Sequence, residues 1–446
     1  MKFKIRSLCI ALSLAASANT VQATDLLQVY EQALTNDPAT LQAKAQRNSL
    51  YEEIEQSRAS LLPTISGSVS YTETWNDLPS NFSSAGGQSS VGLSLSQTLY
   101  DNSLWSSLTI AEKSATQADA TYAAALQDLI IRVSTAYFNV LSAQDDYEFQ
   151  GAERRAYERQ LAQTKQRFAV GLSAITDVHS AQAQYDLATA TEITAKNTLI
   201  NNYESLRAIT GVDYKNIDIL DTSRFSATAV SPTNVKDWVK TSEEQSLSLL
   251  SDKIGKDIAE ETISFYKSGH LPTLSLDASG ARTDSNSNSS IYGGKQHNGS
   301  LAVTLDVPIF SGFSVNSQVR QAQYDYVNAS EVLEETHRSV VQNVRSYFNN
   351  VNASISSIRA YEQSVISSQS ALEATQAGFE VGTRTIVDVL NSTSTLYSSK
   401  SELSTARYNY INSVLALKQA AGTLNEQDLA LINRGLTTPP KNTTTQ

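Results

Sequence analysis

The sequence of 446 residues contains a single cysteine, Cys9, within its first ten positions. Basic residues precede a short apolar run there, and the small-x-small sequence Val-Gln-Ala follows it at 21–23. Residues 1–23 are therefore predicted to be a cleaved signal peptide. The exported chain then lacks disulfides, thiol nucleophiles and thiolate metal ligands. Its fold must be stabilised by packing or by assembly.

Positive charge is also scarce, with 34 lysine and arginine residues against 45 aspartate and glutamate residues. The formal net charge of −11 becomes −14 when the three basic residues of the signal are subtracted. This balance argues against nucleic acid and anionic membrane surfaces as partners. No apolar run of about 18 residues follows the signal, which excludes a transmembrane helix but leaves spanning β-strands open.

Groupings of catalytic or metal-binding residues are missing as well. The four histidines show neither metal-ligand spacing nor the spacing of a catalytic triad. They are His179, His270, His297 and His337. We therefore expect no enzyme activity, no metal site and no cofactor.

Proline and glycine, the main helix breakers, are absent from two long stretches. No proline occurs in 80–231 or 309–438, and no glycine occurs in 93–150 or 313–377. Each gap accommodates a helix of about 60 residues, roughly 90 Å long, which must lie along other helices. Apolar residues in the second gap recur at strict sevens, which predicts coiled-coil packing. They are Val344, Val351, Ile358, Val365 and Leu372.

Four short segments alternate apolar and polar residues with the period of two that is typical of β-strands. They lie within 64–75, 90–99, 273–279 and 301–307. We expect two β-hairpins, at about 62–100 and about 271–309, with strands of about 10 residues, long enough to cross a bilayer when tilted. The polar segments 76–88 and 282–298 are predicted to be loops.

Motifs of the first half return in the second half at a nearly constant offset. Leu62-Pro63-Thr64 recurs 209 positions later, and the glycine turn at Gly171 recurs 211 positions later at Gly382. This offset predicts a tandem structural repeat. The predicted units are a first repeat at 24–211, a linker or equatorial segment at 212–235, a second repeat at 236–424, and a partly disordered C-terminal tail at 425–446.

Two hairpins supply four strands, and four strands cannot close a membrane barrel. An open sheet edge in lipid would leave backbone groups without hydrogen bonds, so strands must be pooled between chains. The predicted fold class is therefore an α+β membrane protein. Three chains would form a trimeric 12-stranded outer-membrane β-barrel, continuous with a long periplasmic α-helical coiled-coil barrel.

Several long motifs resemble the TolC family of outer-membrane efflux proteins. They include STAYFNVLSA at 134–143, RFAVGLSAITDV at 167–178, THRSVVQNVRS at 336–346, VGTRTIVDVL at 381–390 and GTLNEQDL at 422–429. The resemblance implies a homotrimer in the cell outer membrane that extends into the periplasm. It implies a passive exit duct for tripartite efflux pumps and type I secretion systems, opened at its periplasmic end. The implied partners are a periplasmic membrane-fusion adaptor, an inner-membrane RND, ABC or MFS transporter, and outer-membrane lipid.

Asp388 and Asn391 are candidate gate residues because they lie three positions apart on one helical face. From the residues alone, Asp388 is equally well explained as a helix-start residue favoured by the helix dipole. The resemblance implies that Asp388 forms an acidic constriction ring in the trimer. Asn391 stands where the family usually has a second aspartate, so we expect an amide ring beside the charged one.

Arg384 is the candidate latch. The resemblance implies that it ties one coiled coil to a neighbour, with Thr176 and Asp177 as acceptors and Gln160 as a further member. The residues alone also fit a surface ion pair, worth about 0–1 kcal/mol. Phe379 replaces a tyrosine that usually hydrogen-bonds here, so we expect a looser latch.

Two other functions fit parts of the sequence. A surface-anchored, adhesin-like coiled-coil trimer would usually carry its strands at one end of the chain, whereas here they recur in both halves. An outer-membrane receptor would bind phage or colicin through 76–88 and 282–298, and this role is compatible with export.

Overall fold

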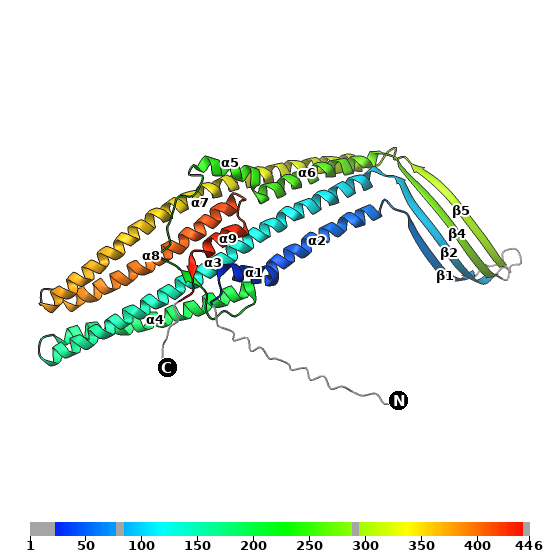
Figure 1. Cartoon of the computed structure of the whole chain (residues 1–446). Helices are drawn as coiled ribbons and strands as arrows, with labels where there is room; N and C mark the ends of the chain where they lie inside the picture. The colour runs from blue at the N-terminus through cyan, green and yellow to red at the C-terminus, as the bar shows by residue number, and fades with distance from the viewer. Residues whose placement is uncertain (1–22, 77–83, 288–293, 440–446) are drawn as a thin grey trace, which may run out of the picture.

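A computed structural model of the chain describes residues 23–76, 84–287 and 294–439. The predicted signal peptide, apart from Ala23, and the last residues of the predicted tail lie outside this part of the chain. The described molecule is elongated, with the four-stranded sheet at one end and the turns between the long helices at the other (Figure 1).

Helices make up most of the described chain. They are α1 (Leu26–Asn36), α2 (Pro38–Ala59), α3 (Asn102–Ala169), α4 (Ile175–Thr210), α5 (Val235–Gln245), α6 (Leu247–Lys267), the short 3-10 turn η1 (Ser268–His270), α7 (Ser314–Glu380), α8 (Ile386–Ala420) and α9 (Glu426–Asn433). The stretches without helix breakers become α3 and α7, of 68 and 67 residues. Among the described residues, no helix has both the length and the apolarity needed to cross a membrane.

The helices α3 and α7 pack against other helices along their length. In α7, four of the five residues spaced at sevens are buried, and Val344 and Val351 are fully so. These residues contribute to clusters shared with α8, and α3 in turn contacts α2, α4, α6 and α8. Heptad spacing therefore marks the buried side of α7, as the coiled-coil pattern predicts.

Six strands occur in the described chain. They are β1 (Thr64–Asn76), β2 (Ser84–Tyr100), β3 (Ile219–Leu220), β4 (Thr273–Ser287), β5 (Gly294–Asp306) and β6 (Leu436–Thr437). The long strands form one antiparallel sheet in the order β1-β2-β4-β5, so the two hairpins pair with each other through β2 and β4. Apolar side chains on the sheet are exposed, with Val69 82% and Leu301 75% accessible.

The expectation of loops at 76–88 and 282–298 is wrong for the residues that the structure describes, whereas 77–83 and 288–293 lie outside the described residues. Strand β2 begins at Ser84, β4 continues to Ser287 and β5 begins at Gly294, so the described residues of both segments are strand. Backbone pairing continues there, for example between Thr283 and Gln296, although the side chains no longer alternate between apolar and polar. Strand pairing needs only backbone donors and acceptors, which polar residues also supply.

The largest buried cluster lies near the middle of the molecule, where α1, α3, α4, α8 and α9 meet. Tyr137 and Phe138 of α3 are fully buried there, and each contributes about 1.5–3 kcal/mol by leaving water. The Tyr137 hydroxyl donates a hydrogen bond to the carbonyl oxygen of Asp218 at 2.7 Å. This contact holds α3 beside the segment that contains β3.

The described part of the predicted tail is ordered. Helix α9 places Leu429 in the central cluster with no exposed surface, and β6 pairs with β3 through Leu436 and Leu220. The partial disorder expected of the tail concerns 437–446, of which 440–446 lie outside the described residues, whereas 426–436 is helix, turn and strand. Burial of its apolar residues fixes this segment, and composition alone gave no sign of it.

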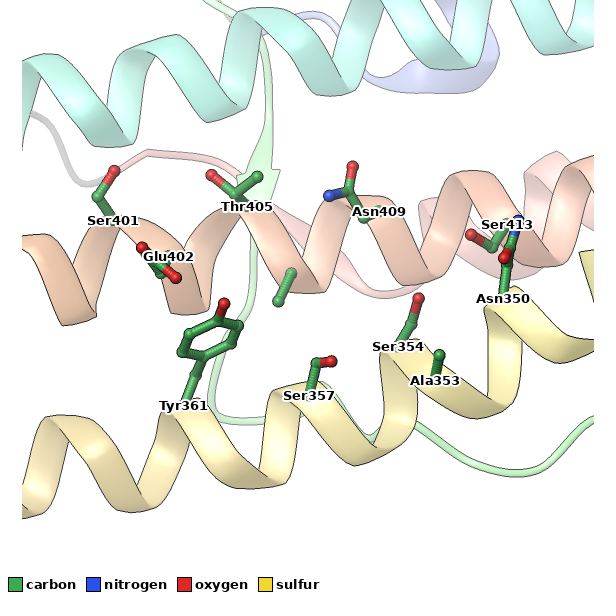
Figure 2. A pocket seen from close by; sticks show the side chains of 11 residues that line it. Asn350, Ala353, Ser354, Ser357, Tyr361, Ser401, Glu402, Thr405, Asn409 and Ser413 are labelled. Carbon is green, nitrogen blue, oxygen red and sulfur yellow. The ribbon is translucent and has the colours of Figure 1, made fainter.

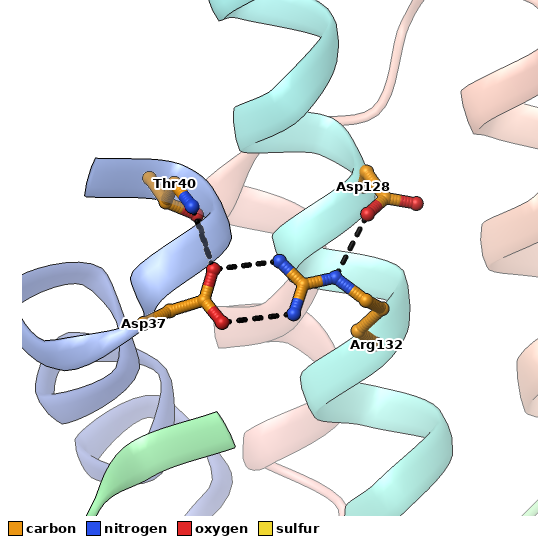
Figure 3. A network of polar contacts seen from close by, with 4 residues as sticks. All are labelled: Asp37, Thr40, Asp128 and Arg132. Carbon is orange, nitrogen blue, oxygen red and sulfur yellow. Dashed lines mark hydrogen bonds and ion pairs between the residues drawn. The ribbon is translucent and has the colours of Figure 1, made fainter. Parts of the chain in front are cut away.

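An ion pair joins the start of α2 to α3 (Figure 3). The Arg132 guanidinium donates to both carboxylate oxygens of Asp37, at 2.9 and 2.7 Å, and also to Asp128 at 2.8 Å. The Asp37 side chain is only 3% exposed, and it also accepts hydrogen bonds from Thr40. The hydrogen bond from Arg132 lowers the pKa of Asp37 to about 2.

Asp37→Asn is expected to lower the free energy of unfolding at neutral pH by roughly 2 kcal/mol, because Arg132 loses the charge of the buried carboxylate that accepts two of its hydrogen bonds. The pKa of Asp37 is lower in the folded chain than in the unfolded one. Its contribution is therefore present above about pH 5 and is lost as the pH falls toward 2.

The measurement is the melting temperature of the purified protein in detergent between pH 3 and pH 7. Asp128→Asn removes the more exposed carboxylate of the same network and is the matched control, with a small effect. Equal melting temperatures of wild type and Asp37→Asn at pH 7 would show that the pair does not stabilise this junction.

Candidate functional site

Two similar turns form the end of the molecule opposite the sheet (Figure 1). Helix α3 turns into α4 through Gly171, and α7 turns into α8 through Gly382, with φ of 78° and 79°. In each turn the N–H after the glycine reaches back to a helix carbonyl, Leu172 to Arg167 and Thr383 to Gly378, both at 2.8 Å. These left-handed positions favour glycine because a Cβ would be strained there.

Asp388 and Asp177 occupy matching positions in the first turns of α8 and α4. The Asp388 carboxylate accepts hydrogen bonds from the Thr385 N–H and hydroxyl, both at 2.9 Å, and Thr385 Oγ1 accepts from the Asp388 N–H. Asp177 likewise accepts from the Ala174 N–H at 3.2 Å and from the Ser173 hydroxyl at 2.7 Å. The backbone hydrogen bond from Thr385 lowers the pKa of Asp388, so its carboxyl is ionised at neutral pH.

Arg384 lies directly against the end of α7. A Cβ added at Gly378 would lie 2.7 Å from Arg384 Cγ, so the absence of a side chain at 378 makes room for the arginine stem. Within one chain, the described residues include no ion pair between Arg384 and Asp177. Thr176 and Asn391 are exposed, as is Arg384.

Gln160 and Phe379 lie farther inside. Gln160 Nε2 is buried and has no hydrogen-bond partner among the described residues. Phe379 is 8% exposed and belongs to an apolar cluster drawn from α3, α4, α7 and α8, which we call the tip cluster. Its buried members are Tyr157, Leu161, Ala181, Ala188, Leu372, Phe379, Ile386, Val389, Leu390 and Leu396.

The tip cluster joins the α3/α4 pair to the α7/α8 pair, and the sequence gave no sign of two of its contacts. The Tyr157 hydroxyl lies 3.2 Å from the Leu390 carbonyl oxygen, which accepts its hydrogen bond. The Arg167 guanidinium lies 4.7 Å from the centre of the Phe379 ring. Both contacts join residues more than 200 positions apart, which no local pattern relates.

Polar contacts join α3 to α8 nearer the middle of the molecule. Asp145 accepts hydrogen bonds from the Tyr408 hydroxyl at 2.8 Å and from the Ser404 hydroxyl. Burial raises the pKa of Asp145. Asp146 accepts from Ser401 at 3.1 Å. These contacts give α3 and α8 a polar seam in addition to the apolar one.

A pocket of about 500 Å³ lies between α7 and α8 (Figure 2). Its described lining residues carry hydroxyl and amide groups and one carboxylate, Glu402, beside the Tyr361 ring. The described lining includes no histidine, lysine or cysteine. Nowhere in the described chain do three His, Cys, Asp or Glu side chains gather as a metal site requires.

Comparison with known proteins shows to which class of protein this chain belongs. The family model described as "Outer membrane efflux protein" matches residues 29–212 and again 238–423. The chain therefore belongs to the outer membrane efflux protein family, and it is an outer-membrane protein of the efflux and secretion class. These matches do not favour an adhesin-like or receptor protein.

Three known proteins are similar to this chain over most of its length. The outer membrane protein TolC of Vibrio cholerae serotype O1 is 48% identical over 435 residues, covering 97% of this chain and 98% of the relative. The alkaline protease secretion protein AprF of Pseudomonas aeruginosa is 29% identical and covers 92% of this chain and 87% of its own length. The Campylobacter jejuni CmeC outer membrane channel has the same fold, with a TM-score of 0.78, 16% identity and 98% of both chains covered.

Thr385→Ala is expected to loosen the first turn of α8, because it removes the cap of the Asp388 N–H, worth about 1 kcal/mol. Amide hydrogen exchange in this turn should become about fivefold faster. Thr385→Ser keeps the hydroxyl and should exchange like wild type. Unchanged exchange in Thr385→Ala would show that the capping box does not order the turn.

Proposed function

We propose that three copies of this chain form the exit duct of an efflux or secretion machine. The carrying observation is the four-stranded sheet: β1 and β5 are its edge strands, and its apolar side chains are exposed. Such a sheet requires further strands before it is placed in lipid. Three copies supply twelve strands, which makes a closed β-barrel, and the helices then form an α-helical barrel in the periplasm.

The proposed duct is built as a tandem repeat. The order hairpin, long helix, glycine turn and helix occurs twice, as β1-β2-α3-α4 and β4-β5-α7-α8, and each half matches the family model separately. We assign 24–211 and 236–424 to the repeats, with 212–235 between them and 425–446 after them.

The proposed conduit carries out no chemistry, and its specificity comes from its partners. The relatives named TolC and AprF support a role in both efflux and protein secretion. The partners that we propose are a periplasmic membrane-fusion adaptor and an inner-membrane transporter of the RND, ABC or MFS class. Outer-membrane lipid would surround the barrel, and nucleic acid is not a partner.

We assign the two turns to the periplasmic entrance. Asp388 of each copy would face the axis and form an acidic ring, with Asn391 as an amide ring beside it. The capping contact of Asp388 is compatible with this, because hydrogen bonding keeps the carboxylate charged. Arg384 would bind Thr176 or Asp177 of a neighbouring copy, and Gln160 and Phe379 would support the closed entrance.

Single-channel recording in planar bilayers tests the duct and the latch together. Wild type should form a pore with a low resting conductance, and Arg384→Ala should raise it several-fold by freeing the entrance. Arg338→Ala, which removes an α7 arginine paired with Glu334 on its own helix, is the matched control. Absence of a pore would refute the duct, whereas a pore that Arg384→Ala leaves unchanged would refute only the latch.

A multivalent cation added on the periplasmic side tests the ring. Three converging carboxylates attract cations, so Asp388→Asn should weaken block by roughly tenfold. Asn391→Asp adds a second charged ring and should strengthen the block by the cation. The ring assignment fails if neither variant changes the blocking concentration.

A further inference from the structure

Arg167 and Phe379 form a direct contact between the two helix pairs of one chain. Arg167 lies in the last turn of α3, and Phe379 lies in the last turn of α7. The guanidinium carbon lies 4.7 Å from the centre of the phenylalanine ring, within the range of a cation–π interaction. The contact therefore joins the end of α3, beside the α3–α4 turn, to the end of α7, beside the α7–α8 turn.

The surroundings of Arg167 leave the ring as its principal partner. Its Nε is buried and has no hydrogen-bond acceptor among the described residues, and the ion pairs of the described chain do not include Arg167. A guanidinium that is partly removed from water and lacks a carboxylate gains more from an aromatic face than an exposed one does.

The position of the ring is set by its neighbours. Phe379 is 8% exposed and packs in the tip cluster with residues of all four long helices. A phenylalanine offers no hydroxyl for a hydrogen bond between the helix pairs, but its face remains available to a planar cation. Phe379, which the sequence led us to expect would loosen the entrance, is thus in contact with Arg167 of the α3/α4 pair.

We propose that Arg167 is a positioning residue for the periplasmic entrance: its stacking on Phe379 holds the α3–α4 turn against the α7–α8 turn and favours the closed conformation. This inference rests on the proposed function, because it requires a duct with an entrance that opens. It differs from the Arg384 latch in using an arginine of α3, an aromatic partner and residues of a single chain.

The contact has a physical signature that separates it from an ion pair. Salt screens pairs of exposed charges, whereas a partly buried cation on a ring is screened much less. The closing effect of Arg167 should therefore persist between low and high ionic strength. An effect that vanished at high salt would identify a carboxylate partner and overturn the assignment.

The test is a double-mutant cycle read by single-channel recording of trimers shown to assemble like wild type. Arg167→Met keeps the apolar stem but removes the cation, and Phe379→Leu keeps an apolar side chain but removes the ring. Each single variant should raise the ratio of open to closed time by about two- to fivefold for each Arg167–Phe379 contact that it removes. The double variant should show no more than the larger single effect, because the two residues act as one unit.

Two further variants separate positioning from general loosening. Arg167→Lys keeps a cation near the ring but loses the planar stack, so it should restore part of the closed time that Arg167→Met loses. Arg159→Met removes an exposed arginine two turns earlier on α3 and should behave like wild type. The proposal is overturned if the single effects multiply in the double variant, or if Arg167→Met matches Arg159→Met. A wild-type protein that forms no gated pore would instead overturn the proposed function.

Discussion

Helix α3 is the element on which the rest of the chain depends. It runs for 68 residues and contacts α1, α2, α4, α6 and α8. A helix of this length, roughly 100 Å, extends well beyond any single compact core. Its burial is therefore divided among a central cluster around Tyr137 and Phe138, the tip cluster, and a polar seam with α8. Because the buried contacts of α3 are divided in this way, the two ends of the molecule can differ in how many apolar side chains they expose.

At one end, the sheet exposes apolar side chains and has two edge strands, which suits lipid and further copies of the chain. At the other end, the two helix pairs meet through a small cluster and a few polar contacts. Local stability follows local burial, so the small size of the tip cluster is compatible with the opening that we propose there. Membership of the outer membrane efflux protein family is the basis for our proposal that the chain forms a duct anchored at the sheet and regulated at the tip.

Features set by neighbouring residues could be predicted from the sequence. The missing helix breakers located α3 and α7, and the spacing of Thr385 and Asp388 is a local capping pattern. Alternation located the sheet but not the length of its strands, because the outer strand residues are polar on both faces. The β3–β6 pair and the Arg167–Phe379 contact join distant segments without any periodic signal, so only the folded structure reveals them.

The central claim is that contact between the two helical turns closes the duct. Cysteines at positions 167 and 379 test it directly, because the predicted mature chain has no other thiol. Conductance would be recorded before and after the two sites are bridged by a short bis-methanethiosulfonate, which forms a disulfide with each thiol by release of methanesulfinate and is cleaved again by a thiol reductant. The account predicts high conductance without the bridge, the resting value with it, and high conductance again after cleavage. A conductance that stays the same in all three states would contradict it.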